Sequence, residues 1–200
     1  MTYVQWVERV LRALDGWKSE IVIPWDLSVP LGLARMEDDH PAWPDDIDAN
    51  EATRAIFDAL QDLISLGLAT LAMQDVPQPF AITEAGRRAA GSGMDQVLGA
   101  KIREACQALD GLQQDFLNHL VSLAKARPQP SDLYVVNERV SANDVYEAMG
   151  RQYDADEASA VTTSLAERSL IDRSPDPANR PSYPAGGISV RPYYAGFMCA

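Results

Sequence analysis

Side chains that bind metals or perform catalysis are scarce in this chain of 200 residues, which contains only two cysteines and two histidines. Cys106 and Cys199 lie far apart, without a CxxC spacing, so the sequence predicts neither a zinc site nor a disulfide framework. Cys106 falls on the apolar stripe of an expected helix, where a buried free thiol is the usual form of cysteine. No glycine-rich phosphate loop follows an expected strand, and no nucleophile has a base nearby in sequence. We therefore expect no enzymatic activity, no catalytic residues and no cofactor.

His40 is the one histidine with acidic neighbours, Glu37 and Asp39. No second group of ligands at helical spacing supports a metal site there, so none is predicted. Residues 46–57 begin like a calcium loop, but glutamate replaces the glycine at position six and phenylalanine replaces the glutamate at position twelve. Helix capping by Asp48 explains this segment better.

Long hydrophobic runs are also absent. No apolar run approaches the roughly 18 residues of a membrane span, and no basic segment followed by an apolar block opens the chain. Hydrophobic residues make up 46% of the sequence and charged residues 23%, as in folded globular proteins. We expect a cytoplasmic protein with no membrane partner.

Positive charge is scarce as well, since 17 lysines and arginines face 29 aspartates and glutamates, for a net charge of −12. Residues 1–93 hold 7 basic and 15 acidic residues, and residues 94–200 hold 10 and 14. A protein whose affinity comes from neutralising phosphates has the opposite balance. Binding to DNA is therefore possible but not favoured.

The most informative feature present is a repeated plan, in two stretches about one hundred residues apart. Residues 63–70 end a helical run and lead through a turn into residues 80–88. Residues 165–172 end another helical run and lead through a longer turn into residues 187–194. Helix, strand, turn and strand follow in the same order each time, which indicates a tandem repeat. Such a repeat favours a protein that recognises a partner over an enzyme.

The pattern predicts a mainly α (α+β) protein of two domains joined by a long helix. The predicted parts are an N-terminal domain over 1–93, a connecting helix over 94–127 and a C-terminal domain over 128–200. Asp110-Gly111 could kink or split the connecting helix, because glycine disfavours helix interiors. In the C-terminal domain we expect a first strand at 133–136.

The first stretch resembles the C-terminal half of winged-helix repressors of the MarR and PadR type. In those families a Leu-Gly-Leu turn leaves the recognition helix, as at 66–68, and Thr-Glu-x-Gly-Arg follows the wing, as at 83–87. Residues 141–192 resemble the same unit, with Ser169 in the place of Gly67 and Val190-Arg191-Pro192 in that of Ile82-Thr83-Glu84. The resemblance implies two helix-turn-helix domains of the winged type.

The expected third helices differ from those of such repressors, which offer basic or amide side chains to DNA. In the first, Asp58 and Asp62 lie one turn apart on the expected polar face and would repel phosphate. The second carries Asp154, Asp156 and Glu157. The first domain is therefore expected to be a poor reader of DNA.

Tandem winged-helix chains with acidic surfaces are also similar to the kite subunits of SMC complexes, a class that includes segregation and condensation protein B. The likeness lies in architecture and charge, and it implies that the fold grips another protein. We expect a non-enzymatic adaptor or regulator acting through protein–protein contacts, as a homodimer or as a subunit of a DNA-associated complex.

The alternative is a transcriptional regulator that reads DNA through its C-terminal domain. Its candidate DNA contacts are Arg173, Arg180 and Arg191 beside the second wing, with Arg87 and Arg88 of the first domain. These arginines could equally balance neighbouring carboxylates.

Two surfaces are candidates for protein contacts. Trp25 and Trp43 stand in a proline-rich region and could meet a partner or cover the core of the first domain. The apolar stripe of the connecting helix could pair with a second copy in a homodimer, or be buried within one chain. Its candidate residues are Leu98, Ile102, Leu109, Leu112 and Phe116.

Overall fold

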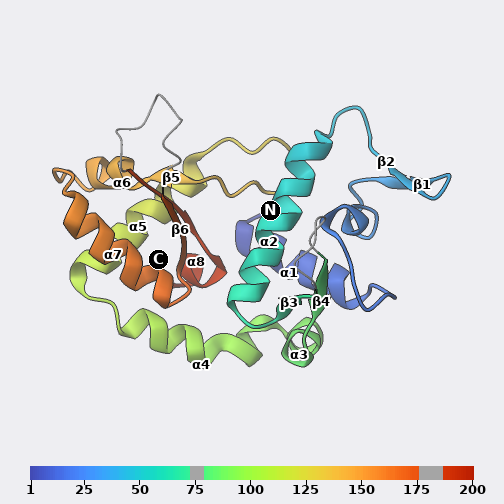
Figure 1. Ribbon diagram of the computed structural model, residues 1–200, viewed down its shortest axis with the longest axis horizontal. Helices are drawn as coiled ribbons and strands as arrows, with labels where there is room; N and C mark the ends of the chain where they lie inside the picture. Colours follow the sequence, from blue (N-terminus) through green and yellow to red (C-terminus); the bar gives the residue numbers. More distant parts are fainter. Residues whose placement is uncertain (73–78, 176–186) are drawn as a thin grey trace. The chain divides into compact units, whose positions relative to one another are not determined.

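A computed structural model describes residues 1–72, 79–175 and 187–200 of the chain (Figure 1). It consists mostly of α-helices with small antiparallel sheets, which confirms the predicted mainly α (α+β) class. The chain divides into two compact units. The first unit comprises Met1–Gly99 and Gln129–Val136, and the second comprises Ala100–Pro128 and Asn137–Ala200. No helix in the described part of the chain is long and apolar enough to cross a membrane.

The first unit contains helices α1 to α3, the start of α4, a short 3₁₀ helix and four short strands. In chain order these are α1 (Tyr3–Asp15), η1 (Pro24–Ser28), β1 (Arg35–Glu37), β2 (His40–Ala42), α2 (Ala49–Ser65), β3 (Ala69–Leu71), β4 (Phe80–Ile82), α3 (Glu84–Ser92) and α4 (Met94–Gln107). β3 and β4 are antiparallel, and Val22 forms a bridge to Phe80 on the other side of β4.

Packing of α1 against α2 forms the core of the first unit. The buried face of α1 includes Trp6, whose indole N–H donates to the carbonyl of Ala55 on α2 at 3.1 Å. Asp48 caps α2 by accepting from the backbone N–H groups of Asn50 and Glu51, which are otherwise without helical partners. The helix leads into Gly67, whose φ of +74° is readily adopted only by glycine.

The second unit contains the end of α4, followed by α5 (Gly111–Ala126), β5 (Val140–Ser141), α6 (Ala142–Ala148), α7 (Ala155–Glu167), β6 (Ile171–Pro175), β7 (Ile188–Pro192) and α8 (Tyr194–Cys199). Its sheet is antiparallel with the order β5-β7-β6. Phe116 of α5 and Tyr146 of α6 are fully buried and meet edge to face, with ring centroids 5.9 Å apart. Their contact stabilises the packing of these two helices.

Apart from the hairpin β1–β2 of the first unit, the described residues of the two units share one order of elements: a helix, a short extended segment paired to the sheet, a short helix, a longer helix, two strands and a final helix. The final helices α3 and α8 approach the sheet in the same way. A Cβ atom at Gly86 of α3 would lie 2.1 Å from the carbonyl oxygen of Leu68, and one at Gly196 of α8 would lie 2.2 Å from that of Leu170. Each close approach requires glycine.

The register of this correspondence differs from the predicted one. Thr83 precedes α3 and Tyr193 precedes α8, and their N–H groups donate to the carbonyls of Leu68 and Leu170 at 3.0 and 2.9 Å. Thr83 therefore corresponds to Tyr193, and the predicted match of residues 190–192 with 82–84 is wrong by two positions. The predicted match of Gly67 with Ser169 agrees with the backbone, since Ser169 also has a positive φ, of 57°.

The connecting segment is not one long helix. α4 ends at Gln107 and α5 begins at Gly111, because Asp110 caps α5 in a reciprocal box with Gln113. The predicted strand at 133–136 is also absent from the described residues, and this segment belongs to the first unit. There Arg9 donates to the carbonyl of Leu133 at 3.3 Å.

The prediction of a buried free thiol at Cys106, with no disulfide in the chain, is wrong. Cys106 at the end of α4 and Cys199 at the end of α8 form a disulfide, with their Cα atoms 5.3 Å apart. Both residues are half-buried and belong to the second unit. The bond joins positions separated by 93 residues, so it ties the two ends of this unit together.

Candidate functional site

An open groove of about 390 Å³ lies between η1 and the outer face of α2 in the first unit. It is lined by Pro24, Trp25, Asn50, Thr53, Arg54 and Phe57. The four residues from α2 recur at the spacing of one helical face. The groove therefore occupies the solvent side of α2, opposite the face that packs on α1.

The two tryptophans predicted as interface residues meet at one wall of this groove. Their ring centroids lie 5.3 Å apart at an interplanar angle of 67°, an edge-to-face arrangement. Trp25 lines the groove and keeps 37% of its surface exposed, whereas Trp43 is half-buried. Trp25 is thus available to a partner, and Trp43 supports it from the side.

Phe57 is the aromatic residue of the groove that sequence reasoning missed. It lies on the polar side of α2, and the one indication of its role in the sequence is an aromatic residue among polar neighbours. Its ring packs edge to face on that of the buried Phe80, with the ring centroids 5.9 Å apart. Trp25 and Phe57 come from segments about thirty residues apart. Their meeting could not be read from spacing along either segment.

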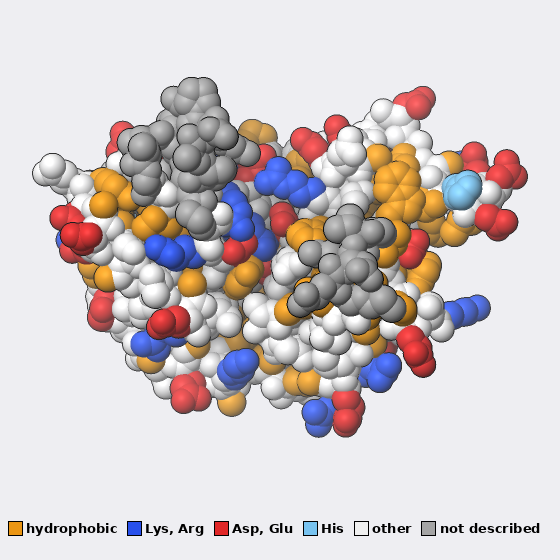
Figure 2. All heavy atoms as spheres, in the orientation of Figure 1, with side chains coloured by type: hydrophobic (Ala, Val, Ile, Leu, Met, Phe, Trp, Pro, Cys, Tyr) orange, Lys and Arg blue, Asp and Glu red, His pale blue; other side chains and the backbone are white. Residues whose placement is uncertain are grey.

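An acidic β-hairpin, β1–β2, is inserted between η1 and α2. Its turn places Asp38 and Asp39 at φ values of 45° and 64°, and its ladder pairs Arg35 with Ala42. In Figure 1 the hairpin extends away from α1 and α2. Residues 35–51 hold seven carboxylates and one arginine, and all seven acidic residues are exposed. Figure 2 shows acidic side chains gathered around this hairpin, beside hydrophobic ones.

The acidic residues of α2 contribute less negative surface than predicted. Asp62 is fully buried and Asp58 is half-buried. Asp62 therefore cannot repel a phosphate at the surface, and that prediction is wrong. Seven exposed carboxylates of the first unit are instead grouped on the hairpin and around the start of α2.

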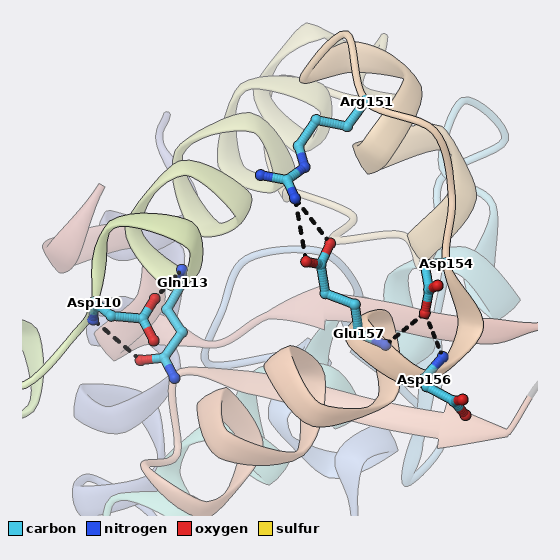
Figure 3. Close-up of polar contacts among 6 residues, drawn as sticks. All are labelled: Asp110, Gln113, Arg151, Asp154, Asp156 and Glu157. Atoms are coloured by element: carbon cyan, nitrogen blue, oxygen red, sulfur yellow. Dashed lines mark hydrogen bonds and ion pairs between the residues drawn. The ribbon is translucent and has the colours of Figure 1, made fainter.

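The N-terminus of α7 in the second unit is already occupied by carboxylates of the chain itself (Figure 3). Asp154 accepts from the N–H groups of Asp156 and Glu157 at 3.0 and 2.9 Å. Arg151 holds both carboxylate oxygens of Glu157 at 3.1 Å. These contacts engage two of the N–H groups at the start of the helix and pair Arg151 with a carboxylate, and the acidic side chains there oppose the binding of a phosphate.

The arginines proposed as DNA contacts have different surroundings. Arg191 is only 2% exposed, lies 3.8 Å from a carboxylate oxygen of Asp172, and stacks on Tyr193 with its Cζ atom 5.2 Å from the ring centroid. Its prediction as a phosphate contact is wrong. Arg173 is exposed but donates to the hydroxyls of Thr162 and Ser159 on α7 at 3.0 and 3.1 Å.

Two further candidates, Arg87 and Arg88, are exposed on α3. Arg180 lies outside the described residues. The structure brings none of the described candidates into the groove of the first unit, which is lined by one arginine, Arg54.

The apolar stripe of the predicted connecting helix is largely buried within one chain. Leu98 and Ile102 are 5% and 6% exposed, and Phe116 is not exposed at all. Leu109 and Leu112, at the break between α4 and α5, are half-buried. The three buried residues are therefore not available to pair with a second copy, and for them the alternative, burial within one chain, applies.

Two tyrosines have a pKa above the ordinary value of tyrosine. Burial raises the pKa of Tyr146 to about 12, and the adjacent carboxylate of Glu157 adds to the effect. Burial also raises the pKa of Tyr134, with smaller contributions from Glu51 and Asp48 at the start of α2. Both phenols are buried, and neither lines the groove. In the described ranges, no three His, Cys, Asp or Glu residues are grouped so that they could hold a metal ion.

Comparison with known proteins found no matching family model, no matching curated protein and no matching solved structure.

Proposed function

We propose that both units are winged-helix domains and that the chain is a non-enzymatic adaptor that binds a protein partner through the groove of the first unit. The observation that carries this proposal is the position of the groove. In a winged helix, α2 would be the recognition helix, which enters the major groove of DNA. Here the outer face of that helix forms an aromatic cavity with Trp25 and Phe57, and aromatic residues are typical of protein interfaces.

The hairpin supports the same proposal. Helix-turn-helix motifs join their two helices by a short turn of three or four residues, which lets both approach the duplex. In the first unit, η1 ends at Ser28 and α2 begins at Ala49, and the acidic hairpin lies between them. In the second unit the corresponding connection, from α6 to α7, spans only residues 149–154. An acidic projection beside the recognition helix opposes docking on phosphates.

A regulator that reads DNA through the second unit has weaker support. Arg191 is buried, Arg173 is hydrogen-bonded to α7, and the N-terminus of α7 is capped by its own carboxylates. Action as an acidic subunit of a DNA-associated complex remains compatible with the proposal, because such a subunit needs no phosphate contacts of its own.

Site-specific photocrosslinking in the native cell tests the proposal. A photoreactive amino acid replaces Asn50, which is exposed at the groove, or in a control Thr163, which is exposed on α7. We expect a discrete protein adduct from position 50 and none from position 163. Adducts of equal yield at both positions, or a nucleic-acid adduct at position 50, would contradict the proposal.

A further inference from the structure

We infer that the groove of the first unit accepts a segment of a protein that carries an uncharged apolar anchor next to lysine or arginine residues. The inference rests on the proposed function and specifies the chemistry of the partner. It combines three observations: the aromatic walls of the groove, the exposed carboxylates of the hairpin and of the start of α2 around it, and the lack of a hairpin and of a counterpart to Phe57 in the described part of the second unit.

The cavity itself selects an apolar anchor. A volume of about 390 Å³ lies near the small end of the range for ligand pockets, so it suits one or two side chains. Pro24, Trp25 and Phe57 supply apolar walls. Arg54 also lines the groove and would repel a cationic side chain inside it, whereas the exposed carboxylates around the groove would repel an anionic one. The buried part of the ligand is therefore neutral.

The surroundings of the groove select basic residues next to that anchor. Glu51 lies one turn before Arg54 on α2, and Asp45 and Asp46 follow Trp43, whose ring contacts Trp25. All three carboxylates are exposed, as are those of the hairpin turn. Complementary potentials steer partners to a surface and set their specificity. The exposed part of the Trp25 indole adds a face on which an ammonium or guanidinium group can stack.

The second unit is an internal comparison. Leu68 and Leu170 donate to the carbonyls of Leu63 and Leu165 in equivalent turns, which aligns the ends of α2 and α7. Counting back the same number of residues from Leu68 and from Leu170 places Ser159 where the first unit has Phe57. The described part of the second unit also has no hairpin between α6 and α7. In the described part of the second unit, the position of Phe57 is thus taken by a serine and the acidic insertion is missing.

Peptide selection with the full-length, disulfide-bonded protein tests the inference. A phage library of random 12-residue peptides is panned on the wild-type protein, and enriched peptides are synthesised with a fluorescent label for anisotropy titrations. We expect enriched peptides to place a large apolar residue beside lysine or arginine. Enrichment of acidic peptides, or no enrichment, would overturn the inference.

Matched variants locate the binding. Asn50→Trp fills the groove from an exposed position, and Thr163→Trp adds the same ring to α7 as a control. The groove variant should weaken peptide binding by at least about tenfold, as for loss of a hot spot, and the control should leave it unchanged. Equal affinity of both variants would show that the peptides bind elsewhere and would overturn the inference. Because both substituted positions are exposed, neither variant removes a core side chain.

Charge reversal on the hairpin tests whether the partner carries basic residues, separately from whether it occupies the groove. The triple variant Glu37→Lys, Asp38→Lys and Asp39→Lys should weaken peptide binding about three- to tenfold at low salt and make the affinity less dependent on salt. The control Glu167→Lys on α7 should change neither the affinity nor its salt dependence. Uncharged peptides that need the groove but ignore the hairpin would overturn the inference and leave the proposed function standing. Failure of every peptide to depend on position 50, together with tight binding of duplex DNA, would overturn both.

Discussion

Alanine at Gly86 should destabilise the first unit strongly. The new Cβ atom would lie 2.1 Å from the carbonyl oxygen of Leu68 and 2.7 Å from Cγ1 of Ile82, whereas Cβ atoms essentially never approach other atoms within 3.0 Å. The first of these neighbours is backbone, so α3 must retreat from the sheet. That movement also strains the hydrogen bond from Thr83 to the same oxygen. Overpacking of this kind costs about 3 kcal/mol, near the upper end of its usual range.

Differential scanning calorimetry measures this effect, and Gly196→Ala provides the same change in the second unit. A loss of about 3 kcal/mol corresponds to a fall in Tm of roughly 12–24 °C for a domain of about one hundred residues. If the two units unfold separately, each variant should lower only its own transition. The control is Gly91→Ala in the same helix as Gly86, because a Cβ atom there meets none of the described residues within 4 Å.

Gly91→Ala should leave stability unchanged or raise it by up to about 1 kcal/mol, since alanine favours helix. Tolerance of alanine at both Gly86 and Gly196 would refute the close approach of the final helices to the sheets. It would also remove the best structural evidence that the two units follow one plan.

Three further predictions concern the second unit. Reduction of Cys106–Cys199 should lower its free energy of unfolding by up to about 4–5 kcal/mol, because the bond closes a separation of 93 residues; an unchanged Tm with and without dithiothreitol would contradict this. Because burial raises the pKa of Tyr146 to about 12, from an ordinary value near 10 in the unfolded chain, its contribution to stability is complete below pH 10 and is lost as the pH rises toward 12. Urea unfolding at pH 9 and 11 should therefore show a smaller loss for Tyr146→Phe than for the wild type. Arg173→Ala should cost about 1 kcal/mol from lost hydrogen bonds to α7 while leaving any affinity for duplex DNA unchanged, and a large drop in that affinity would favour the DNA-reading alternative.

Local features of the fold could be predicted from the sequence because neighbouring residues determine them. The capping residues Asp48, Ser141 and Asp154 predict the starts of three helices, and the side chain of each accepts a hydrogen bond from at least one of the first N–H groups of its helix. The sequence predicts two short strands near 68–73 and 79–82, and among the described residues these strands lie at Ala69–Leu71 and Phe80–Ile82. Helix caps and turns depend on a few adjacent side chains.

Features that depend on distant segments were missed. An amphipathic pattern assigns polar residues to the surface, yet Arg191 is buried because Asp172 and Tyr193 supply a carboxylate and an aromatic face for it. The disulfide gave no signal because its cysteines are separated by 93 residues. The hairpin at 35–42 has neither β-branched residues nor a glycine turn, so the sequence there predicts an acidic loop and not a pair of strands.

The candidate site was predicted only in part, for the same reason. Trp25 and Trp43 were recognised as possible interface residues from their composition and place in the chain. Their contact, and the contribution of Asn50 and Phe57, depend on how η1 packs against α2. The cavity exists only where the two elements meet, so neither segment alone could reveal it.

The central claim is that the outer face of α2 is built to contact protein and repels nucleic acid. Its most direct test is an anisotropy titration of a labelled random-sequence duplex with the full-length protein from low to physiological salt. We predict no association tighter than about 100 µM at physiological salt, the weak end for non-specific binding. Binding near or below about 1 µM that weakens steeply with salt, and that Asn50→Trp abolishes, would contradict the claim.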